Sequence, residues 1–131
     1  MAVLLDTSVL IDVERGARSL PDEDEMAIAA ITASELLHGV HRATARYRVL
    51  RETFVEQLLA EVPTVPFTLA VARVHARLWT ELLAAGRLPG AHDLLVAATA
   101  IAIDWPLATL NRRHFDGVPG LRTYRASADR R

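Results

Sequence analysis

The sequence predicts a three-layer α/β/α fold, in which helices cover both faces of a mostly parallel central sheet of four to five short strands. Short apolar runs, typical of buried parallel strands, alternate along the chain with helical segments. Residues 93–103 are apolar almost all round, as expected of a helix buried in such a fold. With 131 residues, 51% of them hydrophobic, the chain is long enough to bury a core in one domain.

The chain begins with a predicted strand, helix and strand. Residues 2–5 are continuously apolar and predict a central strand, because a parallel strand is buried on both faces. A short helix is expected over 9–14, ending at Gly16. After an acidic loop at 20–25, the apolar run 26–31 predicts the second strand.

Two helices and a short strand are expected next. Thr32 and Glu35 match the S/T-x-x-E capping box, so Thr32 is expected to cap a helix that runs to about Ala43. Apolar residues recur every four positions in 47–60 and predict a second helix. Two prolines in 61–67 predict that any strand there is short and lies at an edge of the sheet.

The remaining elements complete the alternation of strands and helices. Residues 69–84 have an apolar face opposite a charged one and predict an amphipathic helix, which the buried helix 93–103 follows. A short strand is expected at 107–110, and 121–124 is a candidate for a last strand. Residues 126–131 are expected to be a loose C-terminal tail to a domain of residues 1–125.

The composition excludes several kinds of chemistry. There are 15 basic and 16 acidic residues, for a net charge of −1; every basic residue is arginine, and cysteine is absent. A P-loop or a Schiff-base enzyme needs a lysine, and thiolate metal sites or cysteine nucleophiles need a cysteine. No targeting signal is visible, and the longest apolar run, 94–103, is far shorter than a membrane span. We therefore expect a cytoplasmic protein with no membrane contact.

Three carboxylates are expected to share one rim of the sheet. Asp6 follows the first strand, Glu35 follows the second, and Asp93 lies in the first turn of a helix that leads back to a strand. Clustered carboxylates repel one another unless cations lie among them, and their oxygens prefer Mg²⁺ or Mn²⁺. Such a site suits phosphodiester hydrolysis. Acids are also favoured at helix starts by capping and the helix dipole, so Glu35 and Asp93 each remain compatible with a capping role.

Four motifs of the chain resemble those of one nuclease family. They are VLLDTSVLID (3–12), ITASELLHG (31–39), HDLLVAATA (92–100) and LATLNRRHF (107–115). In this order and at these intervals they resemble the PIN-domain nucleases, and within them the VapC-type toxins of toxin–antitoxin pairs. The resemblance implies a PIN fold, a metal-dependent endoribonuclease acting on RNA, a homodimer, and inhibition by a cognate VapB-type antitoxin.

The resemblance also assigns the acids of the site. The family's first three acids fall on Asp6, Glu35 and Asp93, which are expected to bind Mg²⁺ or Mn²⁺ and to be catalytic. Many members carry a fourth acid where this chain has His114. The nearest carboxylate is Asp116, which we take as the candidate for the fourth catalytic and metal-binding position.

Other residues of the motifs are expected to line the site or to bind RNA. Thr7, Thr109 and Asn111 match positions that line or orient the site in the family, although turn and cap chemistry also accounts for Thr109. Arg112 and Arg113 adjoin the last expected strand and are candidates for holding RNA phosphates.

Two other functions are compatible with parts of the sequence pattern. The altered position at His114 leaves open a catalytically weak PIN-like module that binds RNA or a protein without cutting. A phosphatase of the haloacid-dehalogenase type is excluded, because the second aspartate of that motif, two residues after Asp6, is missing.

Overall fold

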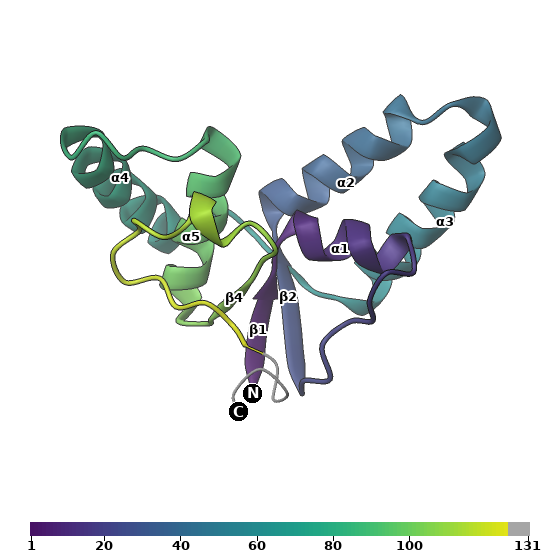
Figure 1. The fold of residues 1–131 in the computed structure, drawn as a ribbon, viewed down its shortest axis with the longest axis horizontal. Coiled ribbons are helices and arrows are strands. Elements are labelled where there is room, and N and C mark those ends of the chain that lie inside the picture. Colours follow the sequence, from purple (N-terminus) through teal and green to yellow (C-terminus); the bar gives the residue numbers. More distant parts are fainter. Residues whose placement is uncertain (126–131) are drawn as a thin grey trace.

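The chain forms a four-stranded parallel sheet with helices on both faces, as seen in a computed structural model that describes residues 1–125 (Figure 1). The strands, in the spatial order β3-β2-β1-β4, are β1 (Ala2–Leu5), β2 (Glu25–Ala29), β3 (Thr64–Val65) and β4 (Leu107–Ala108). The helices are α1 (Thr7–Glu14), α2 (Ala30–Arg42), α3 (Ala45–Glu61), α4 (Leu69–Ala84), α5 (Ala91–Ile103) and the short 3-10 helix η1 (Arg112–His114). This arrangement confirms the predicted three-layer fold. The tail expected at 126–131 lies outside the described residues.

The central strand β1 contributes to two hydrophobic cores, one on each face of the sheet. Leu4 packs with residues of α4 and α5, whereas Val3 and Leu5 pack with residues of α1, α2 and α3. Figure 1 shows these two groups of helices on opposite sides of the sheet. Because all three side chains are fully buried, the strand is apolar at consecutive positions, which is the pattern that predicts it.

The register of the strands brings their carboxyl ends to one rim of the sheet. Leu5 at the end of β1 pairs with Ala108 at the end of β4, and Asp6 N donates to Ala108 O at 2.9 Å. On its other side β1 pairs with β2, which continues directly into α2. α5 leads back toward the start of β4, so its first turn lies at this rim as well. The residues that follow β1 and β4 therefore meet the first turns of α2 and α5.

The predicted capping box at Thr32 is wrong. β2 ends at Ala29, which is itself the N-cap residue with φ −73° and ψ 155°, and α2 begins at Ala30. Thr32 lies inside the first turn and is fully buried, while Ile31 packs against the core on the α4–α5 side. Burial of these two side chains outweighs the small gain from a side-chain cap. Glu35 consequently lies in the second turn of α2.

The other boundaries differ little from those expected. The first helix begins at Thr7 rather than at residue 9, and β4 ends at Ala108 rather than at 110. The candidate last strand at 121–124 forms only a single parallel bridge, between Thr123 and Leu107. β3 is short and lies at the edge of the sheet, as its flanking prolines predict. Among the helices of residues 1–125, none is long and apolar enough to cross a membrane.

The buried hydroxyl of Thr32 is predicted to lower the free energy of unfolding. Its Oγ1 is buried and has no hydrogen-bond partner within the described residues. A buried hydroxyl without a partner costs about 1–3 kcal/mol, so Thr32→Val should raise the free energy of unfolding by about 1 kcal/mol and Tm by about 4 °C. Calorimetry or thermal denaturation followed by circular dichroism measures the change.

The matched control is Thr99→Val in α5. Thr99 is also buried, but its Oγ1 donates to Leu95 O at 2.8 Å, so this substitution removes a satisfied hydrogen bond. It should leave Tm unchanged or lower it. If the Tm of Thr32→Val is no higher than that of the wild type, the Thr32 hydroxyl is not a source of instability.

Candidate active site

Asp6 lies at the centre of the rim and is oriented by two hydroxyl groups. It is the N-cap residue of α1, it is only 5% exposed, and it makes no side-chain cap hydrogen bond. Its Oδ2 accepts hydrogen bonds from Ser8 Oγ and from Thr109 Oγ1, each at 2.8 Å. No donor among residues 1–125 bonds to its Oδ1, so this oxygen remains available to a ligand at the rim.

Both hydroxyls also accept from backbone N–H groups. Ser8 Oγ accepts from Leu110 N at 3.0 Å, and Thr109 Oγ1 accepts from Asn111 N at 3.0 Å. Because an ionised carboxylate only accepts, each hydroxyl donates its proton to Asp6 and uses a lone pair for the backbone N–H. The segment after β4 and the start of α1 are thereby joined through one carboxylate oxygen.

Glu35 is held between α1 and α5. Its Oε1 accepts from Thr7 Oγ1 at 2.7 Å, and His92 Nδ1 lies 3.3 Å from its Oε2. The side chain is about one-third exposed. Glu35 therefore reaches the rim from the second turn of α2, with one oxygen directed by a residue next to Asp6.

Asp93 completes the group of carboxylates. It lies in the first turn of α5, and His114 Nδ1 of η1 lies 3.1 Å from its Oδ2. Burial raises the pKa of Asp93, and the negative charges of Asp6 and Glu35 raise it further, while His114 opposes these effects. The structure therefore brings Asp6, Glu35 and Asp93 to one rim, where they interact electrostatically.

Side-chain capping does not explain these acids. The N-cap positions of α1, α2 and α5 make no side-chain cap hydrogen bond. Within the described part of the chain, Asp6, Glu35 and Asp93 accept no hydrogen bond from a helix-start N–H and instead contact hydroxyl or imidazole groups. The capping alternative is therefore not supported at Glu35 or Asp93.

The candidate fourth acid lies apart from the other three. Asp116 is exposed beyond η1, and it has no ion pair among residues 1–125. It lines a neighbouring cavity of about 590 Å³ to which Asp93 and His114 also belong. The position beside Asp93 is occupied by the imidazole of His114. The structure thus places Asp116 near the site but not beside the three carboxylates.

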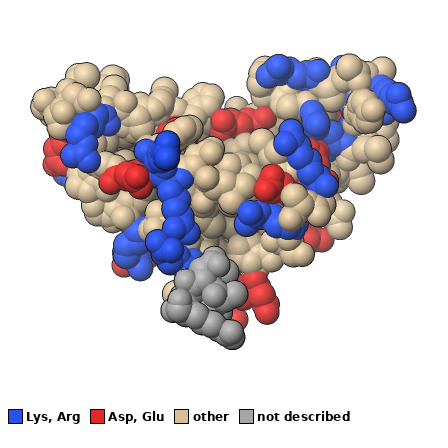
Figure 2. Space-filling model, in the orientation of Figure 1, with Lys and Arg blue, Asp and Glu red and all other residues tan. Residues whose placement is uncertain are grey.

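The two arginines expected to bind RNA lie next to the rim. Arg112 and Arg113 belong to η1, and both line a second cavity of about 660 Å³ to which Thr109 and Asn111 also belong. Figure 2 shows basic side chains in a column over the region where Figure 1 draws η1 and the chain after it.

The donors at the rim suit a divalent cation. Carboxylate oxygens are the ligands that Mg²⁺ and Mn²⁺ prefer, and burial, together with the charges of Asp6 and Glu35, raises the pKa of Asp93. As the side chains stand, no three potential ligands within residues 1–125 are close enough to hold a metal ion. Glu35 and Asp93 instead face His92 and His114. The ligand chemistry of the three carboxylates therefore fits a divalent cation.

Sequence reasoning did not single out Ser8, although it contacts both Asp6 and the segment after β4. Its position two residues after an N-cap aspartate is a common setting for local hydrogen bonds and was the available signal. Its approach to Thr109, 3.4 Å away and 101 positions later in the chain, follows only from the pairing of β1 with β4.

Comparison with known proteins identifies the family. A family model described as the PIN domain matches residues 3–121. Ribonuclease VapC of Rickettsia bellii is 35% identical, over 92% of this chain and 93% of its own length. A chain in the structure of VapBC-5 from Mycobacterium tuberculosis is 30% identical to this chain and has a TM-score of 0.76. The match covers 95% of this chain and 98% of that one. A chain of VapBC2 from Rickettsia felis, in a crystal structure with promoter DNA, has a TM-score of 0.85 at 24% identity. The match covers 95% of this chain and 98% of that one, and at this identity it supports the fold alone.

These matches extend over nearly the whole chain and include the segments that carry Asp6, Glu35 and Asp93. The same segments form the rim described above. The chain therefore belongs to the PIN-domain family, in the group of the VapC proteins.

Proposed function

We propose that the chain is a metal-dependent endoribonuclease that hydrolyses phosphodiester bonds of RNA, and that it acts as the toxin of a toxin–antitoxin pair in the cytoplasm. One observation carries the proposal: three carboxylates share a rim and interact electrostatically, and hydroxyl groups orient two of them, Asp6 and Glu35. The relative in Rickettsia bellii is named a ribonuclease, which supports the same reaction.

In this proposal Asp6, Glu35 and Asp93 hold Mg²⁺ or Mn²⁺, with Asp116 as a fourth candidate ligand. A bound cation of this kind activates a water molecule and stabilises charge on phosphate oxygens. The protein's own contribution is to orient the ligands. Thr109 directs Asp6, and Thr7 directs Glu35, so neither carboxylate has to be ordered when the cation and substrate arrive.

Substrate binding is assigned to guanidinium groups. Arg112 and Arg113 lie beside the rim and would hold phosphates of the RNA strand that flank the scissile bond. Asn111 lies between them and Thr109, where it lines the path to Asp6. A net charge of −1 does not oppose RNA binding, because part of the negative charge lies at the rim and would be compensated by the cation.

Two protein partners belong to the proposal. The solved structures that match the fold contain VapBC complexes, which supports a cognate VapB-type antitoxin for this chain. Exposed apolar side chains on and near α4 support a homodimer. They are Phe67, Leu69, Trp79 and Leu83, each more than half exposed.

The second candidate function is a PIN-like module that binds RNA or protein but cuts poorly. Its support is the contact of His114 with Asp93, at the position where many family members carry an acid. The two functions differ in whether the purified protein cleaves RNA when a divalent cation is present.

The first test of the nuclease is the substitution Asp6→Asn. It removes the charge of the central carboxylate while keeping its shape, so the cation should bind poorly and cleavage of RNA should slow on the order of 10³-fold. Gel assays of structured RNAs with Mg²⁺, with Mn²⁺ and with chelator measure the rate. The control, Glu56→Gln, changes an exposed acid of α3 and should leave the rate unchanged.

Two results would contradict the mechanism. Cleavage that survives chelator, or that is unchanged in Asp6→Asn, would rule out the carboxylate–metal site. Absence of cleavage by antitoxin-free protein, with RNA binding retained, would favour the binding module.

The second test uses the raised pKa of Asp93. Burial and the charges of Asp6 and Glu35 make the ionised form less favourable in the folded chain than in the unfolded chain. The destabilisation is therefore present at pH values above the raised pKa and is lost as the pH falls toward the ordinary value of 3.8. Without metal, Asp93→Asn should have a higher Tm than the wild type at pH 7, and the difference should disappear in acid.

Mg²⁺ supplies the internal check of this prediction. It should raise the Tm of the wild type but not that of Asp93→Asn, because only the wild type keeps all three carboxylates. Asp22→Asn, in the loop before β2, serves as the control for replacing an exposed aspartate away from the rim. A metal-free Asp93→Asn protein that melts below the wild type at pH 7 would refute the claim of repulsion at the rim.

A further inference from the structure

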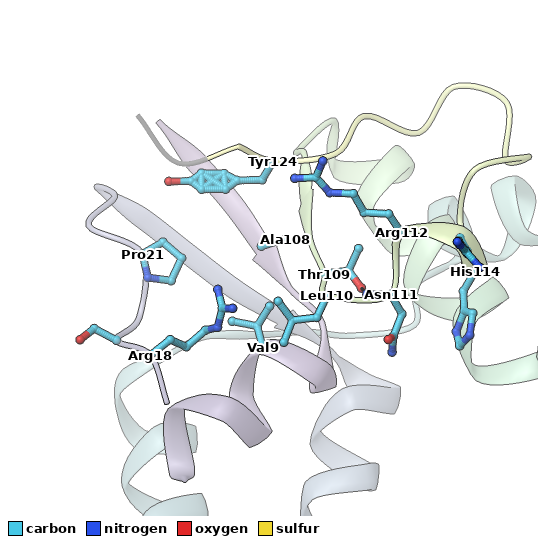
Figure 3. A pocket seen from close by; sticks show the side chains of 12 residues that line it. Val9, Arg18, Pro21, Ala108, Thr109, Leu110, Asn111, Arg112, His114 and Tyr124 are labelled. Atoms are coloured by element: carbon cyan, nitrogen blue, oxygen red, sulfur yellow. Dashed lines mark hydrogen bonds between the residues drawn. The ribbon is translucent and has the colours of Figure 1, made fainter. Parts of the chain in front are cut away.

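A cavity of about 660 Å³ lies beside the carboxylate rim, on the side of β4. Its walls are the loop after α1, the end of β4, η1 and the segment that carries Tyr124. Figure 3 shows Asn111 and His114 near one end of it and Tyr124 near the other. The cavity is large enough for a nucleotide and open to the solvent.

One end of this cavity touches the proposed reaction centre. Thr109 lines it and donates to Asp6 Oδ2 at 2.8 Å, and His114 lines it and contacts Asp93 at 3.1 Å. A polymer whose scissile phosphate lies at the carboxylates would therefore continue into the cavity with its next residue.

The charged groups of the cavity are basic. Arg18 comes from the loop after α1 and Arg112 from η1, and Figure 3 shows the two side chains on separate walls. Arg112 has no ion pair within residues 1–125, and Arg18 uses only its Nε, 3.4 Å from Asp12 Oδ2. No carboxylate of the described residues lines the cavity. Guanidinium nitrogens that are not engaged by carboxylates favour an anionic ligand such as phosphate.

The rest of the lining is apolar or aromatic. Leu110 is 41% exposed and lies next to Val9 in the wall, while the ring of Tyr124 lies toward the far end with its hydroxyl donating to Glu23 at 2.7 Å. A large apolar side chain exposed inside a basic cavity suits a ligand that is flat and apolar in one part and anionic in another. A nucleotide has this composition, because a base is joined to a phosphate.

We infer that this cavity is a nucleotide-binding subsite for the RNA strand, next to the scissile bond. Arg18 and Arg112 bind the phosphate adjacent to the scissile one, and Leu110 and Tyr124 contact the base. The inference rests on the proposed function and deepens it, since it names a surface that sets which nucleotide flanks the cut. Contact with the base at Leu110 makes the subsite a source of sequence preference.

The phosphate contacts are tested by the salt dependence of RNA binding. A short labelled single-stranded RNA of mixed sequence is titrated with the full-length protein in chelator, so that metal-dependent cleavage is absent. Each lost phosphate contact lowers the slope of log K against log salt by about 0.7 for single strands. Arg18→Gln and Arg112→Gln should each show this decrease, whereas Arg73→Gln, an exposed arginine of α4, should not.

The base contact is tested by the pattern of cleavage. Leu110→Ala should weaken RNA binding about 5-fold with no change in the salt slope, because an apolar contact is lost and no charge is removed. With Mg²⁺ it should relax the nucleotide preference at one position beside the cut. Leu110→Met keeps an apolar side chain of similar size, so it should bind RNA as tightly as the wild type and keep the wild-type nucleotide preference. This control separates loss of the base contact from a general folding defect.

The outcomes separate this inference from the proposed nuclease. If Asp6→Asn abolishes cleavage but the Arg18, Arg112 and Leu110 variants bind and cut like the wild type, the nuclease stands and the subsite is refuted. Wild-type protein that binds no RNA refutes the subsite as well. Variants that keep normal RNA binding but escape inhibition by the antitoxin would assign the cavity to a protein partner and overturn the inference.

Discussion

The rim of this protein depends on the two hydroxyl groups that donate to one oxygen of Asp6. Ser8 comes from the start of α1, and Thr109 follows β4, 103 positions after Asp6 in the chain. Each hydroxyl also accepts a backbone N–H from the segment after β4 through its lone pairs, while its proton is donated to the carboxylate at 2.8 Å. This arrangement orients Asp6 and at the same time attaches η1, with its arginines, to the end of the sheet.

The same rim brings three carboxylates together. Thr7 and His92 contact Glu35, and His114 contacts Asp93, yet burial and the charges of Asp6 and Glu35 keep the pKa of Asp93 raised. A protein optimised for stability alone would not bring these acids together. Stability lost at a group of like charges is typical of a binding site, where a ligand of opposite charge restores it.

The sequence was sufficient for the features that depend on patterns along the chain. The apolar run of β1, the two-faced pattern of α4 and the prolines around β3 each predicted the element found. The parallel topology then placed Asp6, Glu35 and Asp93 at one rim. The start of α2 was mispredicted at Thr32, because burial of Thr32 and Ile31 is a tertiary effect that a local capping pattern does not contain.

Contacts between segments that lie far apart in the chain could not be predicted from the sequence either. The position of His114 could be read from its motif, but its contact with Asp93 requires η1 to fold back over the first turn of α5. The resemblance of this motif to the family led us to expect an acid at this position, whereas the structure has an imidazole there, with His114 Nδ1 3.1 Å from Asp93 Oδ2. A cation at the rim could bind Asp93 through its other oxygen, or it could take Oδ2 only by displacing the imidazole of His114. The residue that departs from the expected pattern therefore bears directly on how strongly the rim could hold a cation.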